Sequence, residues 1–494
     1  MNEELFVTDD PGLAGPGVGS GGGQLAGSAW DRIFKSANVI GELRKALAAG
    51  YETDPASMTD SGDALRIQSL EQTLKNLTFT EKSTVLANEL LKNKNTADST
   101  VLEYSGYDEI SEAYPYQEGG LPPQESDGYF RNFELVKYIG AIGQVTNVIL
   151  KTNTLMDAIA SETKRKTLAI KRTLNRIGYF GDKVLIPTEF DGMLQAVLRN
   201  APQNVFDMQG NRPTIENFND AVAQLEDVRG YVSNLRLFTS PFAKNQYRNQ
   251  LLKDKRYIVG GEHSAEVEGV KADKIVYDGG EFPMFKDKFL NPTNTHPRVA
   301  RKSQTFIVSG DKPPATATKS GATEFAVSGA APAGVTSVIP AGTYDFAVVA
   351  KNALAQKSVP AQTLGVVVAA GQVVTFTAVD GGSPAAQIAT CFELFMRPAG
   401  KQNTDYQFIA TISATDAENG WVYDGSDIPG TGYMFLVDWD MEEVLRYRQL
   451  MDMAKFELGP VADSRWWLQR LYGTLMVYNP ALIYVFKNVG KNPV

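Results

Sequence analysis

The segment MDAIASETKRKTLAIKRTLNRIGYFGD, residues 156–182, carries the strongest local pattern in the chain. Side chains suited to one buried face recur every three or four residues, which is the spacing of an amphipathic helix. These positions are Ile159, Thr163, Ile170, Leu174 and Ile177. Gly178 and Gly181 supply a C-terminal stop. We predict a helix from about Leu155 to Arg176, roughly 30 Å long at 1.5 Å per residue.

The opposite face of this predicted helix is basic. Its cations are Lys164, Arg165, Lys166, Lys171, Arg172 and Arg176. Such a face either contacts phosphates or an acidic partner, or is a solvated surface whose charges favour the C-terminal end of the helix dipole. The sequence leaves both interpretations open.

A long extended excursion precedes the helix. Residues 104–132, YSGYDEISEAYPYQEGGLPPQESDGYFRN, are rich in tyrosine, acids, glycine and proline. The following FELVKYIGAIGQVTNVIL alternates like a strand. Because a structureless stretch of this length inside a compact domain is uncommon, we predict a projecting β-arm that is buried against a partner.

The N-terminal region has two parts that differ in composition and pattern. The first thirty residues are glycine-rich and have no hydrophobic period, which indicates a flexible arm. Gly17, Gly19 and Gly22 fit G-x-G-x-x-G, but without a preceding strand and a following helix they do not indicate a dinucleotide site. Residues 30–94 have the spacing of amphipathic helices, ending in EKSTVLANELLKN.

Residues 183–300 mix helical and strand patterns without regular alternation, which favours an α+β core over a nucleotide-binding parallel sheet. We expect KVLIPTEFDGMLQAVL to pass from a short strand into a helix, TIENFNDAVAQLEDVRGYV to form a helix, and NLRLFTSPFAKNQYRNQLL to form a strand, a turn and a helix.

From about residue 301 to 432 the chain becomes rich in Ala, Gly, Thr, Val and Ser. Short strand patterns with turn residues between them predict a β-sandwich inserted in mid-chain. Insertions of this kind are tolerated where an exposed loop has close ends. For residues 433–494 we expect a helix around Met441–Met453, then two paired strands or a hairpin around Asn479 and Pro480.

The charge and length of the chain limit the classes of function that it can have. The 494 residues are enough for several domains. The 48 basic and 57 acidic residues give a net charge of −9, which argues against an electrostatic nucleic-acid binder. The acidic N-terminus and the absence of a long apolar run lead us to expect a soluble chain made in the cytosol, with no membrane contact.

The residues that most enzymes need are scarce. The chain has two histidines, His263 and His296, and one cysteine, Cys391, and contains no phosphate loop, zinc-protease motif, nucleophile elbow or calcium loop. We expect His263 to be loop surface and His296 a turn residue. Cys391 is expected to be a buried small hydrophobe and the pair Trp466–Trp467 packing residues. No catalytic residue, metal ligand or cofactor is predicted.

The order of these segments resembles the major capsid proteins of tailed bacteriophages, the Hong Kong 97 fold. The extended loop would be Tyr104–Ile149 and the spine helix Leu155–Arg176. GYFGDKVLIPTEFDGMLQAV and RLYGTLMVYNPALIYVFKNVG resemble the passage to the compact domains and the closing strands of the peripheral domain. GTYDFAVVAKNALAQKS, AAGQVVTFTAV and SDIPGTG resemble the immunoglobulin- or fibronectin-like insertions of some members.

The resemblance implies an α+β chain of five parts. These are an N-terminal arm with helices (1–103), an extended β-loop (104–150), the spine helix with the first part of the peripheral and axial domains (151–300), the inserted sandwich (301–432) and a return segment (433–494). It also implies self-assembly, not catalysis. Hexamers and pentamers would form an icosahedral head around double-stranded DNA, assembled in the host cytoplasm, with scaffold, portal and decoration proteins as further partners.

The candidate residues for contacts between subunits are the acids of the loop and the basic residues near it and on the spine helix. They are Glu109, Glu112, Glu118, Glu125, Arg131, Lys164, Arg165, Lys171 and Arg172. A bacterial nanocompartment shell, which shares the fold, is the alternative function. A further alternative is an adhesion or binding protein built on the sandwich.

Overall fold

The computed structural model describes most of the chain after its first eighty residues, and residues 76–494 form one compact unit. The described residues are 81–490 without 109–111, 122–127, 153–156, 233, 255–273, 278, 292–295, 297–312, 320–325, 329–336, 402–404 and 460–462. The predicted flexible arm and most of the predicted N-terminal helices lie outside them, as does His263.

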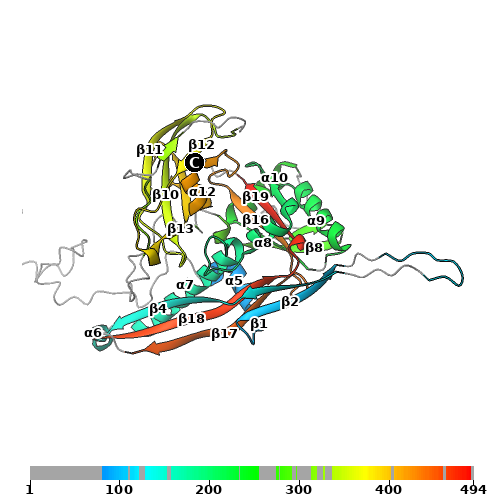
Figure 1. The fold of residues 1–494 in the computed structure, drawn as a ribbon, viewed down its shortest axis with the longest axis horizontal. Helices are drawn as coiled ribbons and strands as arrows, with labels where there is room; N and C mark the ends of the chain where they lie inside the picture. The colour runs from blue at the N-terminus through cyan, green and yellow to red at the C-terminus, as the bar shows by residue number, and fades with distance from the viewer. Residues whose placement is uncertain are drawn as a thin grey trace, which may run out of the picture. The chain divides into compact units, whose positions relative to one another are not determined.

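A long four-stranded sheet forms the base of this unit (Figure 1). Its order is β1 (Asn95–Thr96), β17 (Leu445–Leu458), β18 (Ser464–Val477) and β4 (Lys137–Thr146). β17 and β18 are antiparallel over most of their length, and β4 is antiparallel to β18. Segments more than 300 residues apart in sequence are therefore neighbouring strands.

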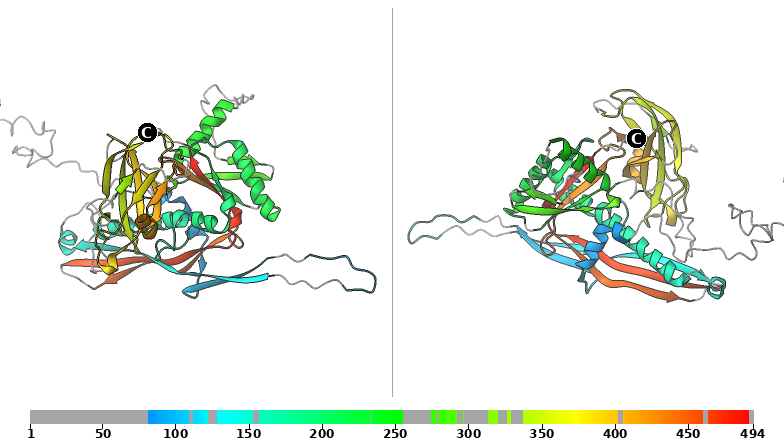
Figure 2. Two further views of the ribbon diagram at one scale, coloured as in Figure 1. Left: turned by 45° about the horizontal axis from the view of Figure 1, so that its top comes forward. Right: turned by 180° about the vertical axis from the view of Figure 1, so that it is seen from behind.

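The predicted spine helix is α7, Ala158–Phe180, and it lies along one face of this sheet (Figures 1 and 2). The side chain of Asp157 caps its first turn by accepting from the Ile159 N–H at 2.8 Å. Its buried positions include Ile170, Leu174 and Ile177, as the periodicity predicted. They share one hydrophobic core with sheet residues such as Ile139, Leu471 and Tyr447, and with α5 (Val85–Lys92).

The predicted β-arm is a two-stranded antiparallel hairpin, β2 (Val101–Asp108) with β3 (Gly128–Leu135) (Figure 1). Among the described residues, its base is tied to the rest of the chain, where Leu102 and Val136 pack with Met476 of β18. The strand pattern of Lys137–Thr146 was predicted correctly, but this segment is β4 of the long sheet and not part of the arm. A short helix, α6 (Asn147–Lys151), follows it.

A six-stranded mixed sheet forms the second part of the core. Its order is β5 (Val205–Asp207), β19 (Ile483–Val489), β16 (Gly432–Asp438), β6 (Leu235–Thr239), β8 (Gly280–Lys286) and β7 (Lys274–Tyr277). One face packs on α9 (Ile215–Arg229) and α10 (Pro241–Asp254), and the other joins the core around α7 and α8 (Met193–Asn200). Because both faces are buried, β16 reads as a continuous apolar run.

The mid-chain β-rich segment forms two sheets around a core of their own. One has the order β11 (Ala361–Val368), β10 (Gly342–Asn352), β13 (Ala389–Pro398) and β14 (Gln407–Ser413). The other is β15 (Trp421–Tyr423), β12 (Val374–Thr377) and β9 (Ala326–Ser328). Phe346, Leu394 and Phe376 lie between them, and α12 (Ala414–Asn419) contributes the buried Ala417. We refer to these two sheets as the sandwich. Short 3-10 turns complete the described elements: η3 (Glu81–Ser83), η4 (Pro202–Asn204), η5 (Lys288–Leu290), η7 (Ala385–Gln387) and η9 (Pro480–Leu482).

Three local predictions were wrong. Met441–Met453 is not a helix, because Leu445, Tyr447 and Gln449 alternate inward along β17 and pair with β18. The strands around Asn479 do not form a hairpin, since β18 belongs to the long sheet and β19 to the six-stranded sheet. The segment after Lys183 forms turns and no strand before α8 begins.

The mixed α+β class, the helices α9 and α10 and the strand β6 were predicted correctly. The spine helix differs from its prediction by about one turn at its C-terminal end, where it runs through Gly178 to Phe180. Among the described residues, no helix combines the length and apolar character required to cross a membrane.

Candidate assembly surfaces

The β2–β3 hairpin carries exposed hydrophobic side chains, which no described part of the chain buries. The pairing register puts Tyr107 opposite Tyr129, and Val101 opposite Leu135, on one face of the hairpin. Phe133 lies on the same face, opposite Glu103. All five apolar side chains are exposed, Tyr129 by 82%. We call these five residues, Val101, Tyr107, Tyr129, Phe133 and Leu135, the arm face.

Side chains of the arm contact one another across its two strands. The rings of Tyr107 and Tyr129 lie 6.3 Å apart between centroids, and Arg131 forms an ion pair with Glu103 on the same face. On the other face, the Phe130 ring lies over Gly106, where a Cβ atom would be 2.3 Å from the ring. Because an isolated two-stranded hairpin is only marginally stable in water, burial of these rings elsewhere would stabilise the arm.

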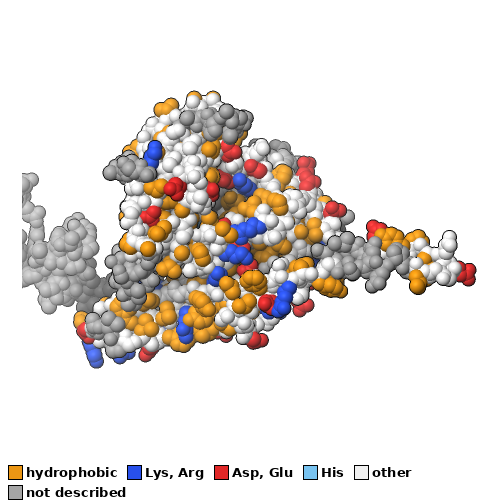
Figure 3. Space-filling model, in the orientation of Figure 1, with side chains coloured by type: hydrophobic (Ala, Val, Ile, Leu, Met, Phe, Trp, Pro, Cys, Tyr) orange, Lys and Arg blue, Asp and Glu red, His pale blue; other side chains and the backbone are white. Residues whose placement is uncertain are grey.

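A second apolar surface lies on the long sheet, on the side away from α7. The register places Tyr138 opposite Tyr472, and Ile142 opposite Leu468. Exposed Phe456 and Leu458 extend this side on β17. Figure 3 shows hydrophobic side chains gathered over this part of the molecule. Contiguous apolar surface of this kind marks sites of protein association.

Two of the four predicted acidic contact residues lie in the described part of the arm. Glu112 and Glu118 are exposed in the described segment beyond β2, whereas Glu109 and Glu125 lie outside the described residues. Arg131 is exposed on β3 and already has a partner within its own chain, Glu103.

The predicted basic residues lie on α7, and its charges are partly balanced within the chain. Lys171 pairs with Glu81 and its charge holds the pKa of Glu81 below the ordinary value. Arg165 pairs with Glu162 at 3.1 Å. Lys164 and Arg165 are exposed, and Arg172 is half-buried. The structure therefore leaves Lys164 as the clearest candidate for contact with another molecule.

Sequence reasoning found the arm but not the arm face. The sequence indicates the acids of the arm as its contact residues, whereas the structure shows an exposed aromatic surface. The signal was present in the sequence, because Tyr107, Tyr129 and Phe133 flank the glycine- and proline-rich turn on both sides. Without the strand register, these rings could not be assigned to one face.

Three of the residues considered for chemistry, Cys391, Trp467 and His296, are in buried positions. Cys391 is buried, as predicted, and burial raises the pKa of its thiol to about 11. Trp467 is also a packing residue, 2% exposed. His296 lies in a bend of the chain and is buried: it is 6% exposed and stacks on Phe408. Within the described ranges, no three potential ligands come together as a metal site.

Comparisons with known proteins gave structural likeness only. No family model matches the chain, and no curated protein matches it. A search of solved structures found the capsid of a native GTA particle at TM-score 0.46 and 8% identity, covering 89% of this chain and all of that one.

Two further structures are similar in the same range. The capsid of cyanophage P-SCSP1u has a TM-score of 0.42 at 9% identity, covering 87% of this chain and 95% of that chain. The holo-SrpI encapsulin complex from Synechococcus elongatus PCC 7942 has a TM-score of 0.40 at 9% identity, covering 87% and 96%. At these identities we base the function on the surfaces of this chain itself.

Proposed function

We propose that the chain is a major capsid protein of the Hong Kong 97 type, a subunit that assembles into the head shell of a tailed bacteriophage. The observation that carries the proposal is the arm face, a row of exposed apolar side chains on a hairpin that packs on the rest of the described chain at its base. An arm built this way gains stability only when it is buried against another molecule.

The elements around the arm have the form that a shell subunit requires. A 23-residue helix packed on a long sheet gives a stiff base, while the six-stranded sheet with its helices gives a second compact part. In this proposal they are the peripheral and axial domains, and residues 301–432 are an immunoglobulin-like insertion between their segments.

A lattice subunit also needs contacts that are each modest, so that wrongly placed copies can leave. The arm face and the long sheet supply two separate apolar surfaces for such contacts. We propose that copies of the chain form hexamers and pentamers in the host cytoplasm and close into an icosahedral shell around double-stranded DNA. The net charge of −9 limits adhesion of the packaged DNA to the wall.

Negative-stain electron microscopy of the purified full chain tests the proposal. Isometric shells, or rings of five and six subunits, are the expected result, and a stable monomer would overturn it. Shells recovered with double-stranded DNA inside support a phage head, whereas shells that enclose a protein cargo instead would identify a nanocompartment.

A paired variant tests the arm face itself. Tyr129→Ser with Phe133→Ser removes two exposed rings, so we expect a folded subunit that no longer assembles. Val276→Ser is the matched control, because Val276 is 72% exposed on β7, outside the arm. Equal assembly of both variants would rule out the arm face as an assembly surface.

A further inference from the structure

The four-stranded sheet of the sandwich is buried on both of its faces. One face packs against the other sheet of the sandwich. On the opposite face, Ala347 and Val349 of β10 and Phe395 of β13 are fully or almost fully buried, and they cluster with Tyr406. A freely projecting sandwich would leave this second face to water, so a neighbouring part of the chain covers it.

Aromatic rings join this face to the end of the spine helix. The His296 ring lies flat on Phe408 of β14, with centroids 4.2 Å apart and an interplanar angle of 13°. Its other contact is with Phe180, the last residue of α7, at 5.8 Å and 67°. His296 is therefore held between the sandwich and α7, where burial lowers its pKa to about 3.

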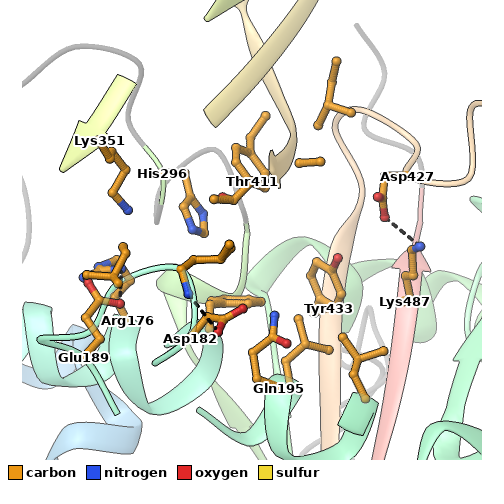
Figure 4. A pocket seen from close by; sticks show the side chains of 18 of the residues that line it. Arg176, Asp182, Glu189, Gln195, His296, Lys351, Thr411, Asp427, Tyr433 and Lys487 are labelled. Carbon is orange, nitrogen blue, oxygen red and sulfur yellow. Dashed lines mark hydrogen bonds and ion pairs between the residues drawn. The ribbon is translucent and has the colours of Figure 1, made fainter. Parts of the chain in front are cut away.

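Two groups of ion-paired side chains meet at the same place, one on the sandwich and one on the core. On the sandwich, Glu393 is fully buried and pairs with Lys357 and with Lys351, the latter at 3.1 Å. On the core, Arg176 of α7 forms a two-point ion pair with the buried Glu189. In Figure 4 the side chain of Lys351 points toward Arg176 and Glu189.

The charges of the two sides act on one another. Burial opposes the charge of Arg176, but Glu189 and, from the sandwich, Glu393 outweigh it and raise the pKa of Arg176. In the same way, Glu189 of the core contributes to the raised pKa of Cys391 in β13. Such interactions reach across the junction only because little water separates the groups.

The segment that follows the last strand of the sandwich is also attached to the core, through β19. Lys487 pairs with Asp427 at 2.7 Å, and the side chain of Asn488 accepts from the Ile428 N–H at 3.0 Å. Between this contact and the His296 stack lies a cavity of about 260 Å³, with the Lys487–Asp427 pair on the far side from Lys351 (Figure 4). The sandwich is thus attached on both sides of the cavity.

We propose that these contacts form a latch that fixes the sandwich to the C-terminal end of α7, so that a displacement of this helix end moves the sandwich with it. The latch consists of Arg176, Glu189, His296, Lys351, Glu393 and Phe408. Opening it would expose charges that are now paired away from water and would separate His296 from Phe180 or from Phe408. The inference concerns one chain and does not depend on shell formation.

The single cysteine gives a direct readout of this latch. Cys391 lies opposite Lys351 in the β10–β13 pairing, on the latch side of the sheet, and it is fully buried. Its thiol can react with a maleimide only when the junction opens or the sandwich unfolds. We expect labelling of the native full-length chain at pH 7 to be at least about 100-fold slower than labelling of the urea-unfolded chain.

Two variants and a control test whether the His296–Phe408 stack keeps the junction closed. His296→Ala and Phe408→Ala each remove one ring of the stack, and we expect each to speed the labelling of Cys391 about tenfold. Leu364→Ala is the control, because Leu364 is 62% exposed on β11 of the same sheet. It should label at the wild-type rate.

Hydrogen exchange distinguishes an open latch from an unfolded sandwich. In His296→Ala the amides of β10 and β13 should stay protected while the thiol becomes reactive. In Phe346→Ala, which damages the sandwich core itself, both should change together. The proposal is overturned by wild-type labelling at the unfolded rate, by equal rates in His296→Ala and Leu364→Ala, or by loss of amide protection in His296→Ala.

Discussion

The Asp287 carboxylate accepts a hydrogen bond from the Asn175 side chain at 2.9 Å, in the interior of the subunit. The same carboxylate oxygen accepts from the Tyr179 hydroxyl at 3.2 Å, and the other accepts from the Phe289 N–H at 2.9 Å. Asn175 in turn accepts from the Ala87 N–H at 2.9 Å. One buried acid thus ties α7 to α5 and to the segment after β8. Burial raises its pKa, although these hydrogen bonds oppose that effect.

Replacing this acid should destabilise the whole core. Asp287→Ala leaves the Asn175 amide, the Tyr179 hydroxyl and a backbone N–H without their acceptor, so we expect a loss of about 3 kcal/mol in the free energy of unfolding. Urea denaturation followed by fluorescence measures it. Asp287→Asn retains an acceptor and should lose less, while Glu118→Ala, at an exposed site, should match the wild type. Similar midpoints for all three variants would contradict this role of Asp287.

The Trp467 ring lies directly over Gly143 in the neighbouring strand. A Cβ atom at Gly143 would be 2.3 Å from the ring, whereas one at Gly140 in the same strand would make an ordinary 3.4 Å contact. We therefore expect Gly143→Ala to destabilise the chain by about 1–3 kcal/mol and Gly140→Ala to have little effect. Thermal unfolding of the two variants compares a steric clash with a matched substitution on β4. A larger effect at Gly140 would show that the packing is different.

The spine helix could be predicted almost completely because its pattern is local. Ile170, Leu174 and Ile177 repeat at helical spacing and are buried in the structure. Its last turn was missed because Gly178 looks like a stop, whereas it packs closely on Leu86 of α5, which would be 2.9 Å from a Cβ atom there. That contact joins distant segments and has no signature in the sequence around Gly178.

Strand β17 shows the other limit of sequence patterns. Val444, Tyr447 and Met451 satisfy a helical period, whereas Leu445 and Tyr447 fit an alternating one. Pairing with β18 decides in favour of the strand, because it buries Leu445 and Tyr447 in the core that α5 and α7 share. The latch could not be predicted for the same reason, since His296 meets Phe180, and Lys351 faces Arg176, only after the sandwich has docked.

Contact between the arm and a neighbouring spine helix is testable by charge reversal. Lys164 and Glu118 are both exposed, and we expect them to face each other between copies of the chain. Lys164→Glu and Glu118→Lys should each reduce the yield of shells in a sedimentation assay, by about threefold for an exposed pair. The double variant should recover most of that loss. A double variant that assembles no better than either single variant would count against this pairing.

Acidification should weaken the latch through His296. The charged groups around its ring are Glu393, Lys357, Lys351 and Arg176, and burial is the main reason for its lowered pKa. The unfolded chain binds a proton at His296 below about pH 6.5, but the folded chain does so only near pH 3. The contribution of His296 to the free energy of unfolding is therefore complete above pH 6.5. It is lost as the pH falls toward 3, by about 1.4 kcal/mol for each pH unit.

Glu393 does not add to this change in stability between pH 7 and 5. Its lowered pKa stabilises the folded chain above about pH 4.5, and that stabilisation is lost only at lower pH. His296→Phe keeps a ring between Phe180 and Phe408 but cannot titrate. The wild type should therefore lose more thermal stability between pH 7 and 5 than His296→Phe does, with the difference set by this one proton. Parallel pH profiles would mean that His296 does not stay neutral and buried in the folded chain, and the stack on Phe408 would then need another explanation.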